Sequence, residues 1–253
     1  MKDRYFSVEV KPTIPASKQH AAAFTAGDVL FDYTEFEIPK GTSRLIGATM
    51  ITRPKGNATP TGNKFGCFLV FSKTNTTGYG TPNSAQTNVP SNDFLGLLEI
   101  ETTTSYTLGA GTQVAMTGRA SNTSSQANLL LTGSQTGSSV GYDKLYVAAQ
   151  ANGAFDFTSI NAIAEDTSAS AAASQVITMD GSSMDVRDHF IAGDVVHIGT
   201  SVGTPAADSL IGTVASADSA TQITLDAVSP TALVDGDILY NIHPIRLILH
   251  FEK

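Results

Sequence analysis

The amino-acid sequence predicts an all-β fold: an antiparallel β-sandwich, jelly-roll-like in organisation, with a second, small β-barrel-like module inserted before the last strand. The first observation behind this is that short apolar or alternating runs recur at about 8–12-residue spacing, separated by turn residues, as in sandwiches and barrels. The second is that helix signals are scarce. His20–Thr25 is a short candidate helix, and Ala162–Ser174 holds too much Ser and Thr for a confident helix, so we interpret it as a linker or short turn.

A third observation is a repeated turn signal, Gly-Asp followed by an apolar pair. It occurs at Gly27-Asp28, Gly193-Asp194 and Gly236-Asp237. Glycine accepts a positive φ and Asp hydrogen-bonds its own backbone, so each signal predicts a turn that leads into a strand. The segment Phe190–Tyr240 therefore reads as a compact unit of about four or five short strands.

The remaining strands follow from alternation or from short apolar runs. In chain order we expect them at Tyr5–Lys11, Gly27–Ile38, Arg44–Arg53, Lys64–Lys73, Phe94–Thr102, Val114–Met116, Leu129–Leu131, Lys144–Ala148 and from Phe155 to Ile160. The run Lys64–Lys73 is the most apolar of the first half and predicts a central strand. Thr74–Asp93 is a long polar stretch, which predicts a surface excursion that contacts a partner.

The last apolar run, Ile245–Phe251, decides the domain organisation. Ile245, Leu247, Leu249 and Phe251 should face one side of a sheet, with the alternate residues on the other. We expect its partner to be the interrupted region around Phe155–Ile163. The prediction is a sandwich made of residues 1–163 plus 243–253, with residues 164–242 inserted as the second module.

Charge and cysteine content exclude several classes of protein. The chain of 253 residues has a formal net charge of −8, only 15% charged residues and no basic cluster along the sequence, which argues against direct nucleic-acid binding. The single cysteine, Cys67, excludes an internal disulfide and a cysteine-ligated zinc site, and we expect it to be buried and inert. No secretory signal is visible, and no apolar run approaches the roughly 18 residues of a membrane helix.

The candidate sites for chemistry are weak. Gly137–Gly141 matches G-x-S-x-G around Ser139, but it lacks the preceding strand and following helix of a nucleophile elbow. Asp180, Asp185 and Asp188 could offer oxygens to Ca²⁺, although the spacing of a calcium-binding loop is absent and a turn is the better interpretation. The histidines His20, His189, His197, His243 and His250 show no metal-ligand spacing.

With few aromatic residues in the loops, a sugar-stacking platform has little support, and Tyr79 and Tyr142 are its only obvious candidates. We therefore expect no catalytic, cofactor-binding or metal-binding residues, and no enzymatic activity.

Four segments carry a resemblance to a known class of protein: Ala26–Ala48, Asp188–Gly199, Ile211–Asp226 and Asp235–Glu252. In amino-acid sequence and in their order along the chain, they resemble virion structural proteins of tailed bacteriophages, of the marine and cyanobacterial type. The resemblance implies a capsid decoration (cement) protein on the outer surface of the major capsid lattice. It further implies the major capsid protein and other copies of the chain as partners, and a location on the virion after synthesis in the host cytoplasm.

No contact residue carries over from this resemblance, because no contact motif can be matched. On the residues, Thr74–Asp93 could lie across neighbouring capsomers, and a charge of −8 would suit a basic patch on the shell. The alternative function is a tail- or fibre-associated adhesin whose inserted module binds host glycan.

Overall fold

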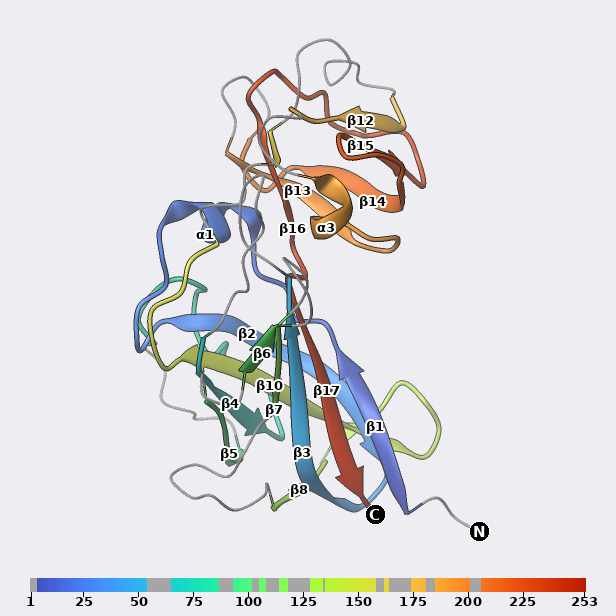
Figure 1. Ribbon diagram of the computed structural model, residues 1–253. Helices are drawn as coiled ribbons and strands as arrows, with labels where there is room; N and C mark the ends of the chain where they lie inside the picture. Colours follow the sequence, from blue (N-terminus) through green and yellow to red (C-terminus); the bar gives the residue numbers. More distant parts are fainter. Residues whose placement is uncertain are drawn as a thin grey trace.

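Three antiparallel sheets form nearly all of the regular structure in the computed structural model (Figure 1). The structure describes residues 4–53, 65–86, 93–101, 105–107, 114–117, 128–133, 135–157, 162–163, 174–180, 185–200 and 206–253. Two sheets pack face to face in the lower half of the view, and the third stands above them. The predicted all-β sandwich is confirmed.

The first sheet of the sandwich has the strand order β1-β17-β3-β7-β6, with β8 also paired to β3. Its strands are β1 (Tyr5–Val10), β3 (Thr42–Thr52), β6 (Ser105–Thr107), β7 (Val114–Thr117), β8 (Leu129–Thr132) and β17 (Ile245–Glu252). The second sheet has the order β2-β10-β4-β5, with β9 paired to β10. Its strands are β2 (Val29–Pro39), β4 (Cys67–Ser72), β5 (Phe94–Ile100), β9 (Gln135–Thr136) and β10 (Tyr142–Ala151).

Aromatic side chains join the two sheets. Phe36 of β2 lies against Phe251 of β17 with ring centroids 6.3 Å apart, and Phe251 stacks on Phe6 of β1 at 5.1 Å. Phe36 also meets Phe71 of β4 edge to face. Each aromatic ring buries a large apolar area, so this contact contributes strongly to holding the layers together.

The last strand has the expected faces but different neighbours. Ile245, Leu247, Leu249 and Phe251 are fully buried, as the alternation indicates. β17 lies between β1 and β3, however, with Leu247 opposite Val10 on one side and Met50 on the other. The expectation that it pairs with Phe155–Ile163 is wrong, because alternation tells which face is buried and not which strand lies alongside.

The third sheet, which we call the upper module, has the order β11-β16-β13-β14-β15-β12. Its strands are β11 (Ala162–Ile163), β12 (Val176–Thr178), β13 (Val195–Thr200), β14 (Leu210–Ala217), β15 (Gln222–Leu225) and β16 (Ile238–Asn241), and the short helix α3 (Val186–His189) lies beside them. Among the described strands no pairing joins β11 to β12, so closure into a barrel is not confirmed. β11 belongs to this sheet although the sequence assigned residues 162–163 to the sandwich.

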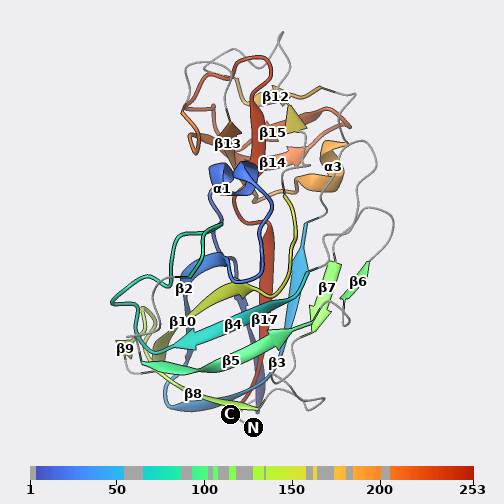
Figure 2. The ribbon, with the colours of Figure 1, turned by 90° about the vertical axis from the view of Figure 1, so that its left-hand side faces the viewer.

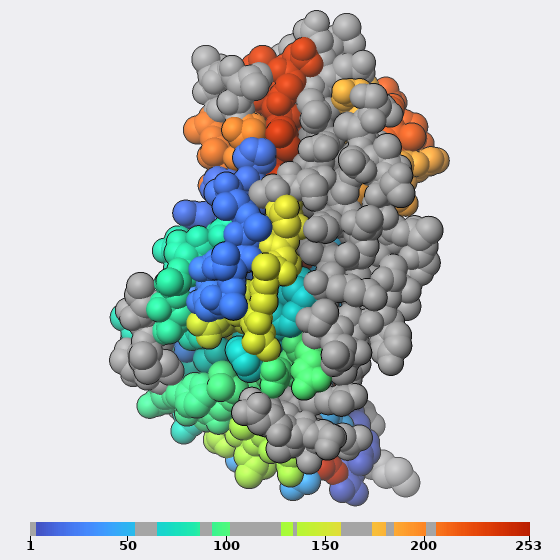
Figure 3. All heavy atoms as spheres, turned by 60° about the vertical axis from the view of Figure 1, so that its left-hand side comes forward, coloured from blue at the N-terminus to red at the C-terminus, as the bar shows by residue number. Residues whose placement is uncertain are grey.

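One helix from the start of the chain packs against the upper module. α1 spans Ala16–Ala21, earlier than the helix expected at His20–Thr25. Ala16 and Gln19 are fully buried, and the Gln19 amide donates to the carbonyl oxygens of Ile14 (2.8 Å) and Asn241 (2.9 Å). Figures 2 and 3 show this blue segment reaching from the sandwich to the module, and one continuous apolar core runs through both.

The polar stretch after β4 is not a free excursion over its described part, residues 74–86. Tyr79 is 5% exposed and meets Tyr33 of β2 edge to face at 5.7 Å. Ala85 forms a β-bridge with Asp28, and the Tyr79 backbone N–H donates to Asp32 at 2.5 Å. The segment therefore covers the outer face of the second sheet, and residues 87–92 lie outside the described ones.

The three Gly-Asp signals form the same turn. Gly27, Gly193 and Gly236 have φ of 97°, 89° and 88°. In each turn the Asp carboxylate accepts from the backbone N–H three residues earlier, at Thr25 (2.7 Å), Ile191 (2.9 Å) and Val234 (2.9 Å). Each turn is then followed by a strand, β2, β13 or β16, as the sequence predicts.

Candidate interaction surfaces

The G-x-S-x-G segment is the tip of the β9–β10 hairpin. The Gly137 N–H donates to the Tyr142 carbonyl oxygen at 2.8 Å, and the Ser138 hydroxyl donates to the Glu37 carboxylate at 2.5 Å. A strand, β10, follows Ser139, whereas a nucleophile elbow requires a helix there. The segment is thus a surface hairpin, and its Val140 side chain is completely exposed.

The acidic segment near α3 serves as a helix cap where it is described. The Asp185 carboxylate accepts from the Arg187 backbone N–H at 3.0 Å and also pairs with its guanidinium group. Residues 181–184 of the segment lie outside the described residues. Over the described ranges, no group of three His, Cys, Asp or Glu side chains is placed to hold a metal ion.

The histidines are dispersed over both tiers of the molecule, the sandwich and the upper module. His250 of β17 shares hydrogen bonds with Ser7 and Thr49 of the neighbouring strands, at 3.0 and 3.1 Å. His20 lies 3.1 Å from the Tyr240 hydroxyl, and His197 bonds the Asp208 carbonyl oxygen at 2.7 Å. These contacts join strands, helix and loops to one another.

Of the remaining sequence candidates, Cys67 and Tyr79 are buried in the structure, whereas Tyr142 is exposed. Cys67 is fully buried, with its sulfur 3.8 Å from that of Met50, and burial raises the pKa of its thiol. Burial, assisted by Tyr33, raises the pKa of Tyr79 to about 12, in keeping with a packed rather than a sugar-binding ring. Tyr142 is 41% exposed on β10.

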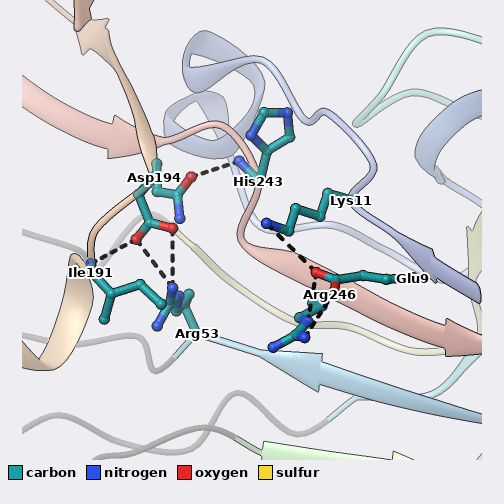
Figure 4. Close-up of polar contacts among 8 residues, drawn as sticks. Glu9, Lys11, Arg53, Ile191, Asp194, His243 and Arg246 are labelled. Carbon is teal, nitrogen blue, oxygen red and sulfur yellow. Dashed lines mark hydrogen bonds and ion pairs between the residues drawn. The ribbon is translucent and has the colours of Figure 1, made fainter. Parts of the chain in front are cut away.

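A buried ion pair joins the sandwich to the upper module (Figure 4). The Arg53 guanidinium, at the end of β3, donates to both carboxylate oxygens of Asp194 at 3.0 and 3.1 Å. The two side chains are 13% and 11% exposed. Burial raises the pKa of Asp194, although the Arg53 charge opposes this shift.

A narrow cleft of about 80 Å³ lies beside this pair, lined also by Lys11, His243 and Arg246. Arg246 and Lys11 both reach Glu9, at 2.7 and 3.5 Å. Small-molecule sites usually measure about 300–1,000 Å³, so this cleft has room for a few waters only. We interpret the arrangement as a clamp that fixes the angle between the two tiers.

Folding gathers a basic cluster that the linear sequence does not show. At the end of the sandwich furthest from the upper module, a groove of about 350 Å³ is lined by Arg4, Arg44 and Lys253, with Glu252 between them. The Lys253 ammonium lies 3.4 Å from the Lys40 carbonyl oxygen, which places Lys40 beside the groove. The expectation of no basic cluster is therefore wrong in space, because the four cations come from segments far apart in sequence.

The charge of the chain is divided unevenly between the tiers. Residues 164–242 contain eleven Asp or Glu and one Arg, a net charge of −10, and the rest contains twelve Asp or Glu and fourteen Lys or Arg, a net charge of +2. The excess of negative charge thus lies in residues 164–242, and the rest of the chain is slightly positive. This uneven division of charge can be found from the sequence alone, provided that the charged residues of 164–242 are counted separately from those of the rest of the chain.

Comparison of the chain with family models, with curated proteins and with solved structures finds no match. Within the described ranges, no helix has both the length and the apolar character needed to span a membrane.

Proposed function

We propose that this protein is a non-enzymatic virion structural component, a capsid decoration (cement) protein that binds the outer surface of the major capsid lattice and stabilises the head. The observation that carries the proposal is the rigid connection between its two tiers. One apolar core runs through both, α1 packs against β13 and β16, and the Arg53–Asp194 pair closes the junction.

Rigidity suits a protein whose task is attachment without turnover. A body that is already ordered loses little conformational entropy when it binds, so more of the contact free energy appears as affinity. A cement protein also has to keep its shape while the shell beneath it is under load. A chain rich in Ser and Thr, with only 15% charged residues, is compatible with dense packing of many copies.

On this proposal the partners are the major capsid protein and further copies of this chain. The location is the capsid surface, after synthesis in the host cytoplasm. No direct contact with nucleic acid and no membrane contact are required.

The test is the copy number and position of the protein in purified particles, by quantitative mass spectrometry and imaging. High copy number over the head supports the proposal. A few copies at the tail would instead favour the adhesin alternative, which predicts that residues 164–242 bind host glycan. A hydrolase would require an activity that is lost in Ser139→Ala.

A further inference from the structure

We propose that the end of the sandwich furthest from the upper module is the docking surface of the molecule, and that it fits an acidic protein surface. We call it the base. Its cations are Arg4, Lys40, Arg44 and Lys253, and its exposed apolar side chains are Tyr5, Leu130 and Val140. The identification of the partner with the capsid lattice rests on the proposed function, whereas the chemistry of the surface does not.

The cations of the base are displayed rather than neutralised. Glu252 is the carboxylate that lines the groove, and it is shared by Arg4 and by Arg44, the latter at 3.5 Å. The Arg4 and Arg44 side chains remain 70% and 50% exposed. In the groove itself one carboxylate faces three cations. Glu37 at the hairpin tip and Asp143 beside Gly41 add two carboxylates to the base, and Lys40 adds a fourth cation, so a smaller surplus of positive charge remains.

Apolar side chains surround these cations. Tyr5 is 60% exposed with the Arg4 guanidinium 5.7 Å from its ring centre, and Leu130 in the groove wall is 59% exposed. Val140 is fully exposed on the hairpin tip, next to Gly141, whose carbonyl oxygen accepts from the Lys40 N–H at 2.7 Å.

Exposed Tyr and Arg beside aliphatic side chains are typical of protein-binding surfaces, where such residues contribute most of the affinity. A surface for nucleic acid would present more cations and polar donors to phosphates.

The charge of the upper module gives the docking a direction. An acidic partner attracts the base and repels the module, which carries −10. Such a polarity orients the molecule during approach and raises the fraction of productive encounters. The base therefore meets the partner first, and the upper module faces away from it.

Matched pairs of variants distinguish the effect of the base residues on binding from the effect of net charge. Lys40→Glu with Arg44→Glu changes two exposed cations of the base. Lys18→Glu with Lys73→Glu makes the same change in net charge on residues that do not line the groove. Val140→Glu tests the apolar tip, and Val228→Glu, at a 49% exposed valine of the module segment, is its control.

The first probe is immobilised poly-L-glutamate, measured by biolayer interferometry with the full chain. We expect salt-sensitive binding that weakens about tenfold or more in the Lys40/Arg44 variant and stays close to wild type in the Lys18/Lys73 variant. No binding by the wild type, or an equal loss in both variants, would overturn the base as the docking surface. Stronger base-dependent binding to a DNA duplex than to poly-L-glutamate would overturn the choice of a protein partner.

The second probe is phage heads from which the protein has been stripped. We expect the wild type to rebind, and both the Lys40/Arg44 variant and Val140→Glu to rebind poorly while unfolding at the wild-type temperature. Base-dependent binding to poly-L-glutamate without rebinding to heads would support the surface and contradict the proposed function. Equal rebinding by all variants would leave the proposed function standing and overturn the base. Self-association that disappears in the Lys40/Arg44 variant would assign the base to a second copy.

Discussion

The sandwich and the upper module share a turn and differ in almost everything else. Both use the Gly-Asp turn to start strands, at Gly27 in one and at Gly193 and Gly236 in the other. The longest strands of the sandwich, β2 and β3, have 11 residues, whereas no described strand of the module exceeds the 8 residues of β14. The net charges are +2 and −10.

The difference shows where the acidity of the module comes from. Asp185, Asp194 and Asp237 each accept a backbone N–H at a cap or turn, and Asp218 accepts the hydroxyls of Ser216 and Thr224 at 2.6 and 2.5 Å. Asp208 accepts the Ser17 N–H of α1 at 2.8 Å. A module of short strands contains many turns, and Asp stabilises turns by accepting hydrogen bonds from the backbone and from nearby hydroxyls. Part of the negative charge of the module therefore follows from its architecture.

The largest effect is expected when the module is deleted. A chain in which a short Gly-Ser linker replaces residues 164–242 should retain the sandwich, because β1, β3 and β17 all lie outside the deleted segment. We expect α1 to unfold, since its buried Ala16 and Gln19 lose the strands they pack against. Circular dichroism and hydrogen exchange would report both results. Loss of the sandwich would contradict the division into two modules.

The junction pair gives the next largest effect. Arg53→Met should destabilise the protein by about 3–5 kcal/mol at pH 7, because it leaves the Asp194 carboxylate buried without its partner. The folded-state pKa of Asp194 is already raised, and this variant should raise it further. A carboxyl group with a raised pKa binds its proton more tightly in the folded state, so the loss of stability should shrink as the pH falls below that pKa.

The control for this prediction is the double variant Arg53→Met with Asp194→Asn, which removes both charges. It should recover most of the lost stability at pH 7 and should lose the pH dependence. Urea unfolding at pH 7 and pH 5 measures both. A single variant that is as stable as the wild type at pH 7 would show that the pair does not fix the junction.

The shared turn predicts a smaller effect that should be equal in the two tiers. Gly27→Ala and Gly193→Ala introduce a side chain at positive φ, and each added Cβ meets only open space. Backbone strain alone should then cost about 1–2 kcal/mol in each variant. Thermal or urea unfolding of the two proteins provides the comparison. Clearly unequal losses would mean that the turns are not equivalent.

The smallest effect concerns salt. The net charge of −10 on residues 164–242 implies self-repulsion, which salt screens. Raising the ionic strength should increase hydrogen-exchange protection in β13 to β16 by up to about 1 kcal/mol and should change β2, β3 and β10 less. Equal changes in both tiers would contradict the view that charge is a local property of the module.

Much of the fold follows from local patterns in the sequence. Alternation gives the buried face of β17, and Gly-Asp gives three turns correctly, because both depend on neighbouring residues. The partners of β17 are strands about 200 and about 240 residues away in the chain, and no local pattern encodes such pairings. Tyr79 lies in a polar stretch of the sequence, so only the folded structure shows that it is a core residue packed against Tyr33.

The two surfaces at the ends of the sandwich were harder to predict for the same reason. Arg53 and Asp194 are 141 residues apart. The cations of the base come from both ends of the chain, from the turn between β2 and β3, and from the start of β3. Neither set has a spacing that a motif could describe. The division of charge can be counted in the sequence. Only the fold shows that the base lies at the end of the sandwich furthest from the acidic module.

The central position of β17 also sets an order of events during synthesis. Every strand of the upper module precedes β17 in the chain, so the module can fold while β1 and β3 still lack the strand that lies between them. The first sheet can close only when the last described residues have been made. Until then, β1 and β3 present unpaired edges to neighbouring chains. The strands of the upper module thus pair without β17, whereas β1 and β3 depend on it to join one sheet.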